Sequence, residues 1–243
     1  MQKTYLRYAP QSILGVVASA RAPIHLFSAS SSSSSSPATA TTVLFPSWDS
    51  AVLWDFAKAA MLGTYLPRKD KVDGEVTALC SFGDVVVLGR FTGRVDVYNE
   101  FGPPRASLSR HRSAVTCVRF NQDGSRFASG ALDTSILIMD TSSDSVLFAL
   151  RGHKDQVTDL VFVGDNSLMS SSKDSLIKVW DLDAQVCFQT IASHKTGVWA
   201  LDLDSASGRV ATGSSDGLIQ LLAKDSISQL WQTLPGPVGR QTT

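Results

Sequence analysis

Serine, histidine and aspartate, the three residue types of a hydrolytic triad, occur together in the second half of the chain. The most complete set is His153, Ser170 and Asp174, followed by Trp180. In one interpretation Ser170 is a nucleophile, His153 is its general base, and Asp174 orients that base. The surrounding sequence has no nucleophile elbow and no oxyanion-hole loop of the kind that such a hydrolase needs. We therefore expect a structural role for this set, and no catalytic residue, cofactor, metal site or small-molecule substrate.

The set belongs to a repeat of about 41 residues. The residues that mark it are His111, His153 and His194 at one position and Asp133, Asp174 and Asp216 at another. Each repeat has a β-rich segment with apolar residues at alternate positions, at 76–79, 115–118, 157–160 and 198–201. Four strands of about 5 to 6 residues and their turns need about 40 residues, and one such sheet cannot bury both faces alone. The repeat therefore predicts stacked four-stranded blades, each with one of these segments as a central strand.

The repeat resembles the WD-repeat pattern, with Gly152-His153 as the opening dipeptide and Trp180-Asp181 at the end of the third strand. The resemblance implies an all-β fold, the β-propeller. It also implies a hydrogen-bonded tetrad inside one blade, in which Asp174 holds His153 and His153 meets Ser170. The serine in turn meets the indole N–H of Trp180. Such a chain of hydrogen bonds supplies partners for buried polar atoms.

Two neighbouring repeats carry partial versions of this tetrad. These are His111, Ser129 and Asp133, with Met139 at the tryptophan position, and His194, Thr212 and Asp216, with Leu222 there. The repeat at 76–99 departs further, because Thr92 takes the aspartate position, Tyr98-Asn99 ends the third strand, and no histidine precedes it. We expect only one complete tetrad, the one that contains Trp180.

An earlier blade is predicted from Trp54-Asp55, which lies about 44 residues before Tyr98-Asn99. Its inner strand would be 12–17, and a following strand would be 23–27. A serine run at 30–36 then precedes the next apolar segment, and because serine has little to bury we predict a disordered loop, 28–41, inserted in this blade. These assignments give five blades, at about 5–55, 60–99, 105–140, 146–181 and 187–222.

Five blades are few for a WD-repeat ring, since propellers have about 4 to 8 blades and these rings most often have seven. After the fifth blade only 227–232 is a candidate for another strand. We predict a partial propeller over 1–235 with a tail at 236–243, forming an incomplete seven-bladed ring that is the first part of a longer protein. A closed ring of five blades is the alternative. An open ring would expose strand edges, which favours aggregation of the chain alone.

Composition and charge are those of a folded cytosolic or nuclear domain. Of the 243 residues, 43% are hydrophobic and 18% are charged, and 22 basic residues balance 22 acidic ones. This balance gives no overall electrostatic footprint for nucleic acid. Cys80, Cys117 and Cys187 lack metal spacing, so we expect buried thiols in a reducing compartment. No apolar run approaches the 18 residues of a membrane span, and no membrane partner is expected.

The amino terminus also has features of a targeting segment. Residues 1–48 contain no acidic residue and are rich in serine, as in an organellar transit peptide, and 13–17 followed by Ala18-Ser19-Ala20 imitates a short secretory signal. A blade strand of the same composition is the competing interpretation, and it is the one that we adopt.

The amino terminus resembles a specific family as well. Residues 3–8 and 13–19 are similar to the opening of the WD-repeat proteins of the small-subunit processome, the family of WD repeat-containing protein three or U-three small nucleolar RNA-associated protein twelve. Further matches to the same family are at 150–158, 173–174, 180–183, 185, 187–188, 190, 194 and 198–199. The similarity covers 1–20 and 72–222, while the serine tract departs from the family over 28–60. Family members are longer, with two tandem propellers and a helical carboxyl-terminal domain, so the functions of that domain are not transferred.

This resemblance implies a non-catalytic scaffold of the nucleus and nucleolus. Such a protein would join other WD-repeat processome proteins around the U-three small nucleolar RNP and pre-rRNA, with indirect contact to the RNA. It would assist early 18S rRNA processing and assembly of the small ribosomal subunit. A generic WD-repeat adaptor in ubiquitin ligation or signalling is the competing interpretation. In both, rigid loops on a propeller contact several partners at once.

Overall fold

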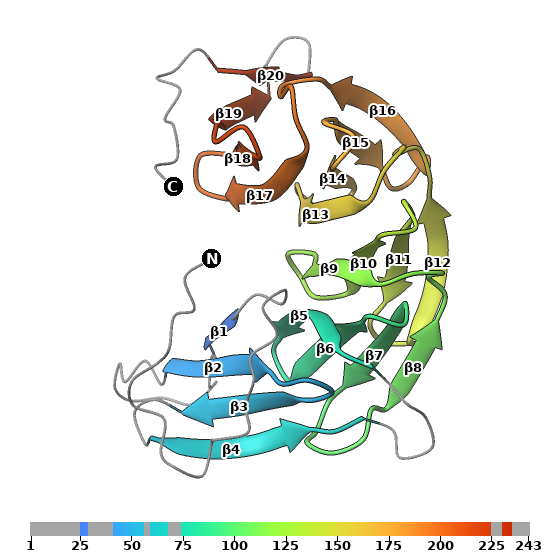
Figure 1. Cartoon of the computed structure of the whole chain (residues 1–243), viewed down its shortest axis with the longest axis vertical. Helices are drawn as coiled ribbons and strands as arrows, with labels where there is room; N and C mark the ends of the chain where they lie inside the picture. Colours follow the sequence, from blue (N-terminus) through green and yellow to red (C-terminus); the bar gives the residue numbers. More distant parts are fainter. Residues whose placement is uncertain (1–24, 29–40, 56–58, 68–73, 225–229, 235–243) are drawn as a thin grey trace.

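The computed structural model describes residues 25–28, 41–55, 59–67, 74–224 and 230–234, and these residues form an all-β fold. Five antiparallel sheets of four strands each follow one another around an arc (Figure 1). Within every sheet the strands pair in sequence order. The prediction of an all-β propeller with five blades is confirmed. Among the described residues, no helix is long and apolar enough to cross a membrane.

The strands of the five blades are as follows. The first blade contains β1 (His25–Ser28), β2 (Thr41–Pro46), β3 (Ala51–Asp55) and β4 (Ala60–Tyr65). The second contains β5 (Val76–Phe82), β6 (Val85–Arg90), β7 (Arg94–Tyr98) and β8 (Ala106–Ser109). The third contains β9 (Val115–Phe120), β10 (Arg126–Ala131), β11 (Ile136–Asp140) and β12 (Ser145–Leu150). The fourth contains β13 (Val157–Phe162), β14 (Ser167–Ser172), β15 (Ile177–Asp181) and β16 (Val186–Ile191), and the fifth contains β17 (Val198–Asp204), β18 (Arg209–Ser214), β19 (Ile219–Lys224) and β20 (Trp231–Thr233).

The sheets group the strands differently from the repeats in the sequence. The predicted unit 60–99 begins with β4, but β4 is the outer strand of the first sheet, and the second sheet runs from β5 to β8. The same offset applies to the units 105–140, 146–181 and 187–222, so the predicted blade boundaries were wrong by one strand. The physical reason is that a repeat fixes a period and not the strand at which a sheet begins. The four segments predicted as central strands are the inner strands β5, β9, β13 and β17 (Figure 1).

The ends of the propeller also differ from expectation. The inner position of the first sheet belongs to β1, whereas 12–17 was predicted there. The candidate strand at 227–232 contributes to β20, which is the outer strand of the fifth blade and starts no further blade. Residues 12–17, the tail at 236–243 and most of the serine-rich segment at 28–41, which connects β1 with β2, lie outside the described residues.

The described strands form an open arc. The first and fifth blades lie on opposite sides of an opening, and the blades between them are stacked one against the next (Figure 1). The alternative of a closed five-bladed ring therefore does not describe this structure.

The hydrophobic core lies between blades. In each of four seams the third strand of one blade packs against the inner strand of the next. The pairs are Ala51 and Leu53 with Val76 and Leu79, Val95 and Val97 with Val115 and Val118, Ile136 and Ile138 with Val157 and Leu160, and Ile177 and Val179 with Val198 and Leu201. Burying one such side chain contributes roughly 1.5–3 kcal/mol relative to leaving it exposed. The seams are therefore the main source of stability.

A threonine crosses three of these seams with a hydrogen bond. The hydroxyls of Thr77, Thr116 and Thr158 donate to the carbonyls of Val115, Val157 and Val198 over 2.6, 2.6 and 2.5 Å. Each threonine is the unpaired residue of a β-bulge at the start of an inner strand. A bulge re-aims a side chain away from its regular direction, and here that side chain reaches the next blade.

Candidate functional site

The structure brings together the four residues of the expected tetrad in the fourth blade. Nδ1 of His153 lies 3.0 Å from Oδ2 of Asp174, and its Nε2 lies 2.7 Å from Oγ of Ser170. The indole N–H of Trp180 donates to the same Oγ over 2.8 Å. Strands β14 and β15 hold the serine and the tryptophan, while the histidine precedes β13 and the aspartate lies in the turn after β14.

Burial determines the protonation of this set. Burial lowers the pKa of His153 and outweighs the opposing effect of Asp174, so the imidazole is neutral at pH 7. Burial alone would raise the pKa of Asp174, but hydrogen bonds from the backbone of Lys154, from His153 and from the backbone of Leu176 lower it. The Nδ1–H of His153 therefore donates to the carboxylate, and Nε2 accepts the Ser170 hydroxyl proton.

The protons are arranged as in a serine-hydrolase triad. However, a substrate has no access to the serine oxygen. Ser170 is 0% exposed, and the Trp180 ring, itself 2% exposed, lies against it. Its oxygen already accepts the indole N–H while donating to His153. A triad serine must reach a substrate carbonyl, and no substrate can approach this buried oxygen. The arrangement can supply hydrogen-bond partners for the polar groups of all four side chains and stabilise the turn that follows β14.

The partial set of the third blade is joined through a serine that the sequence interpretation missed. Nε2 of His111 lies 2.7 Å from Oγ of Ser129 and its Nδ1 lies 3.0 Å from Oγ of Ser135. Ser135 in turn donates to Asp133 over 2.5 Å. Met139 stands at the tryptophan position, fully buried, and gives Ser129 no N–H donor. The detectable signal was Asp133 two residues before a serine, a common turn pattern.

The partial set of the fifth blade is less connected still. Nε2 of His194 lies 2.7 Å from Oγ1 of Thr212. Its Nδ1 is buried and has no hydrogen-bond partner in the part of the chain that the structure describes. Asp216 instead accepts the hydroxyl of Ser214 and the N–H of Leu218. An aspartate is therefore present at the expected position, but it accepts hydrogen bonds from its own turn in place of the histidine.

The second blade replaces the tetrad with an ionic network. Arg90 and Asp96 are both 0% exposed, and Nε of Arg90 donates to Oδ2 of Asp96 over 2.7 Å. Oδ1 of Asp96 accepts Nε–H of Arg94 over 3.1 Å and the hydroxyl of Ser107. The sequence interpretation missed this network, for which the only signal was charge at buried strand positions.

The same network reaches into the first blade. Arg90 donates through Nη1 to the carbonyl of Asp49 over 2.5 Å and through Nη2 to the hydroxyl of Tyr98 over 3.1 Å. The Tyr98 hydroxyl donates to the carbonyl of Leu66, again over 3.1 Å. Asp49 lies between β2 and β3, and Leu66 follows β4. The network thus ties two blades together, whereas the tetrad acts within one.

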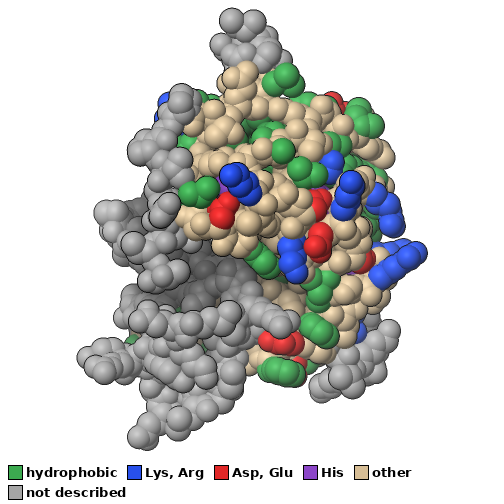
Figure 2. All heavy atoms as spheres, turned by 45° about the horizontal axis from the view of Figure 1, so that its top comes forward, with side chains coloured by type: hydrophobic (Ala, Val, Ile, Leu, Met, Phe, Trp, Pro, Cys, Tyr) green, Lys and Arg blue, Asp and Glu red, His purple; other side chains and the backbone are tan. Residues whose placement is uncertain are grey.

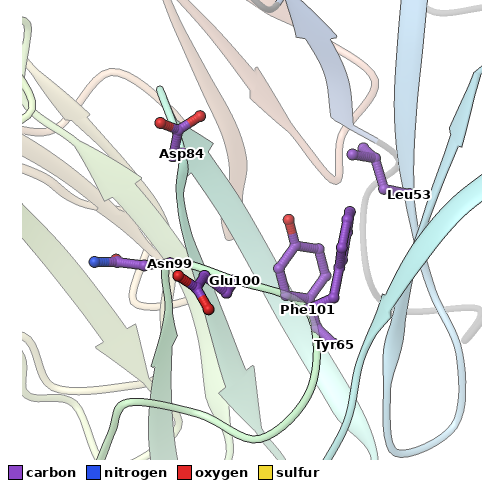
Figure 3. A pocket seen from close by; sticks show the side chains of 6 residues that line it. All are labelled: Leu53, Tyr65, Asp84, Asn99, Glu100 and Phe101. Carbon is purple, nitrogen blue, oxygen red and sulfur yellow. The ribbon is translucent and has the colours of Figure 1, made fainter.

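A pocket of about 490 Å³ lies between the first two blades. Asp84, Asn99 and Glu100 lie on one side of it, and Leu53, Tyr65 and Phe101 lie on the other (Figure 3). Among the described residues that line the pocket, the groups able to exchange a proton are the carboxylates of Asp84 and Glu100 and the hydroxyl of Tyr65. None of the tetrad residues reaches it.

Charge is mixed on the surface. On the face shown in Figure 2, Lys and Arg side chains lie beside Asp and Glu side chains. This agrees with the equal totals of basic and acidic residues. Within the ranges that the structure describes, no three His, Cys, Asp or Glu side chains are grouped to hold a metal ion.

Comparison with known families identifies the repeat. The WD40 model, described as WD domain, G-beta repeat, matches residues 102–140, 144–181 and 185–221. These frames agree with the repeat units read from the sequence, and they are offset from the sheets in the same way.

Known proteins and structures support the same fold. Pre-mRNA-processing factor 19 of Bos taurus is 30% identical over 95 residues, which cover 39% of this chain and 19% of that protein. Nuclear distribution protein PAC1 of Fusarium vanettenii is 32% identical over 139 residues, 56% of this chain and 31% of that protein. The crystal structure of the computationally designed Ika8 protein matches with a TM-score of 0.66 and 28% identity, over 82% of this chain and 60% of that one. The matched regions thus span less than two thirds of each relative. Three repeats of this chain thus match the WD40 model, and its described strands form an open β-propeller of five blades.

Proposed function

We propose that this protein is a non-catalytic scaffold that binds other proteins through the loops of its propeller. The observation that carries the proposal is the burial of Ser170 and His153. Their hydrogen bonds, with that of Asp174, stabilise a turn. Buried, satisfied polar networks make the blades rigid. Rigid blades present loops in fixed positions, which suits simultaneous contact with several partners.

Within this role, we propose a place in the small-subunit processome. The support is the resemblance of 3–8 and 13–19 to that family, together with Trp180-Asp181-Leu182-Asp183 and Cys187-Phe188. The protein would then act in early pre-rRNA processing, with other WD-repeat proteins and the U-three small nucleolar RNP as partners. Location in the nucleus and nucleolus follows from that role. Mixed surface charge favours indirect contact with the RNA.

Affinity purification of the tagged protein from cells tests this assignment. We expect U-three small nucleolar RNA and WD-repeat processome proteins to co-purify, and the tagged protein to concentrate in the nucleolus. Treatment with ribonuclease should leave the protein partners bound, since the contacts with RNA are indirect. Mitochondrial or secreted protein that has lost residues 1–20 would contradict the assignment.

A generic WD-repeat adaptor is the second candidate, because one relative is named as a pre-mRNA-processing factor and another as a nuclear distribution protein. Co-purification of splicing or ubiquitin-ligase proteins without U-three small nucleolar RNA would favour it.

The hydrolase interpretation is tested separately with a fluorophosphonate probe. We expect no labelling of the native protein beyond that of a Ser170→Ala variant. Labelling that depends on Ser170 would overturn the non-catalytic proposal.

A further inference from the structure

The segment that follows β7 leaves its own blade and attaches to the first one. The N–H of Gly102 donates to the carbonyl of Thr64 over 3.0 Å, and the N–H of Leu66 donates to the carbonyl of Gly102 over 2.7 Å. Phe101 lies on Gly63, because a Cβ added to this glycine would collide with the phenylalanine ring. The rest of the ring is open, since Phe101 remains 47% exposed. The attachment thus holds an aromatic side chain at the pocket between the first two blades.

Tyr65 brings a buried polar group to the same pocket. It is 5% exposed, and its ring lies 5.1 Å from the ring of Phe101 at an angle of 51°. Its hydroxyl points into the space between Asp84 and Leu53 (Figure 3). In the part of the chain that the structure describes, this hydroxyl has no hydrogen-bond partner. A buried hydroxyl without a partner costs free energy, and a ligand that supplies the partner removes that cost.

Negative charge lies beside this hydroxyl. Burial raises the pKa of Tyr65, and the charge of Asp84 raises it further. Glu100 adds a second carboxylate to the lining, and neither carboxylate forms an ion pair with any residue of the described ranges. The described lining residues include no lysine or arginine. The pocket therefore combines uncompensated negative charge, a hydroxyl without a partner, and the apolar surfaces of Leu53 and two aromatic rings.

We propose that this pocket binds an arginine side chain of a partner protein. A guanidinium carries only donors and has a planar face, so it donates to the carboxylate of Asp84 and to the oxygen of Tyr65 while it stacks on Phe101. The methylene groups of the arginine pack on Leu53. Glu100, at the exposed rim, strengthens the attraction. The inference rests on the proposed role as a protein-binding scaffold, and it names the chemistry of one partner.

Other occupants fit the pocket less well. A lysine ammonium is a point charge that neither stacks on a ring nor forms a fork with a carboxylate. The phosphates of a nucleic acid would be repelled by Asp84 and Glu100. Calcium and magnesium need more oxygen ligands than two carboxylates supply, and no third His, Cys, Asp or Glu joins them among the described residues. Free arginine carries an α-carboxylate that the pocket repels, whereas an arginine within a chain has no such charge.

Fluorine NMR of the full chain labelled with 3-fluorotyrosine tests the proposal. The chain has four tyrosines, and a Tyr65→Phe variant assigns the Tyr65 resonance. We expect the blocked peptide acetyl-glycyl-arginyl-glycine amide to shift this resonance saturably. The same peptide with citrulline keeps the shape of the side chain without its charge, and it should bind about tenfold more weakly because it loses the ion pair and the cation–π attraction. The lysine peptide and free arginine should also bind more weakly.

Two variants and a matched control locate the site. Asp84→Asn should weaken binding of the arginine peptide by about fivefold. Phe101→Leu keeps an apolar side chain on Gly63 but removes the aromatic face, so it should weaken binding by about threefold. Asp165→Asn is the control, because Asp165 also follows a glycine in an exposed turn, between β13 and β14, and lies outside the pocket. The resonance of Tyr98, which is 0% exposed, shows that each variant is folded.

Several results would overturn the proposal. They are a Tyr65 resonance that ignores the arginine peptide, an equal response to the citrulline peptide, and unchanged binding in Asp84→Asn and Phe101→Leu. Tighter binding of the lysine peptide or of free arginine would assign the pocket to that ligand. A shift that depends on protein concentration without any peptide would assign it to a second copy of the chain. Partner proteins that still co-purify would then show that the arginine site has failed and the scaffold role has not.

Discussion

The fourth and second blades use different side chains to hydrogen-bond the polar group of a buried aromatic residue. Each places an aromatic side chain with a polar group at the end of its third strand, Trp180 in one and Tyr98 in the other. Trp180 is held by a neutral relay of serine and histidine inside its own blade. The Tyr98 hydroxyl is held by Arg90 and by a carbonyl of the first blade.

The difference shows that a polar atom at the end of the third strand, as in Trp180 or Tyr98, needs a hydrogen-bond partner. The residue that supplies this partner can differ from blade to blade. A neutral relay avoids burying charge. An ion pair such as Arg90 with Asp96 carries a large desolvation cost, and it becomes a liability when one partner is lost. The second blade should therefore be the more sensitive of the two to single substitutions.

The largest effect is expected for Asp96→Ala. This change leaves the guanidinium of Arg90 buried without its carboxylate, which costs about 3–5 kcal/mol in the free energy of unfolding. Urea unfolding of the full chain measures it. Asp144→Asn is the control, since it breaks a partly exposed pair with Arg105, keeps a residue type that tolerates the positive φ of 52° at this position, and should cost about 1 kcal/mol or less. Equal losses for the two variants would contradict the distinction.

A smaller loss is expected in the fourth blade. Trp180→Phe removes the donor to Ser170, and Asp174→Ala removes the partner of His153, so each should cost about 1–3 kcal/mol. Met139→Leu in the third blade is a control at the tryptophan position that removes no hydrogen bond to Ser129. Unchanged stability in both fourth-blade variants would refute the structural role of the tetrad.

The histidines predict a dependence on pH. Burial lowers the pKa of His111, His153 and His194 from the ordinary 6.5, so the folded state favours their neutral forms. Their stabilising contribution is present above about pH 6.5 and is lost as pH falls below it, by at most about 1.4 kcal/mol per pH unit for each histidine. Unfolding measured between pH 7.5 and 5 should show this slope. Replacing all three with glutamine should flatten it, and a slope that persists would assign it to other groups.

The smallest effect is expected between the fourth and fifth blades. The side chain of Gln189 accepts the N–H of Trp231 and donates to its carbonyl, both over 2.8 Å, and so pairs with β20 as a strand would. Gln189→Ala should cost about 1 kcal/mol. Hydrogen exchange should rise at 231–233 and remain unchanged in the third blade. Unaltered exchange at 231–233 would show that β20 does not depend on this contact.

Much of the fold could be predicted because every blade repeats one apolar pattern, and the inner strands β5, β9, β13 and β17 lie where alternation placed them. The boundaries of the sheets could not be predicted, because the length of a repeat does not show at which strand each sheet begins. The Trp180 tetrad was expected because this repeat resembles the WD-repeat pattern. Ser135 and the Arg90 network did not, because their partners are set by turn geometry and by backbone atoms of another blade. The orientation of Asp216 away from His194 is likewise a matter of local hydrogen bonds.

Hydrogen exchange on Arg90→Leu and Ser170→Ala tests the central claim most directly, namely that the two networks act over different ranges. Arg90→Leu should increase exchange in β5 to β8 and also in β2 to β4, because Arg90 holds the carbonyl of Asp49. Ser170→Ala removes the hydroxyl that joins His153 to Trp180 and leaves the Trp180 ring in place between the third and fourth blades, so it should increase exchange in β13 to β16 alone. Exchange that rises only in the second blade for Arg90→Leu, or that spreads beyond the fourth blade for Ser170→Ala, would contradict the account.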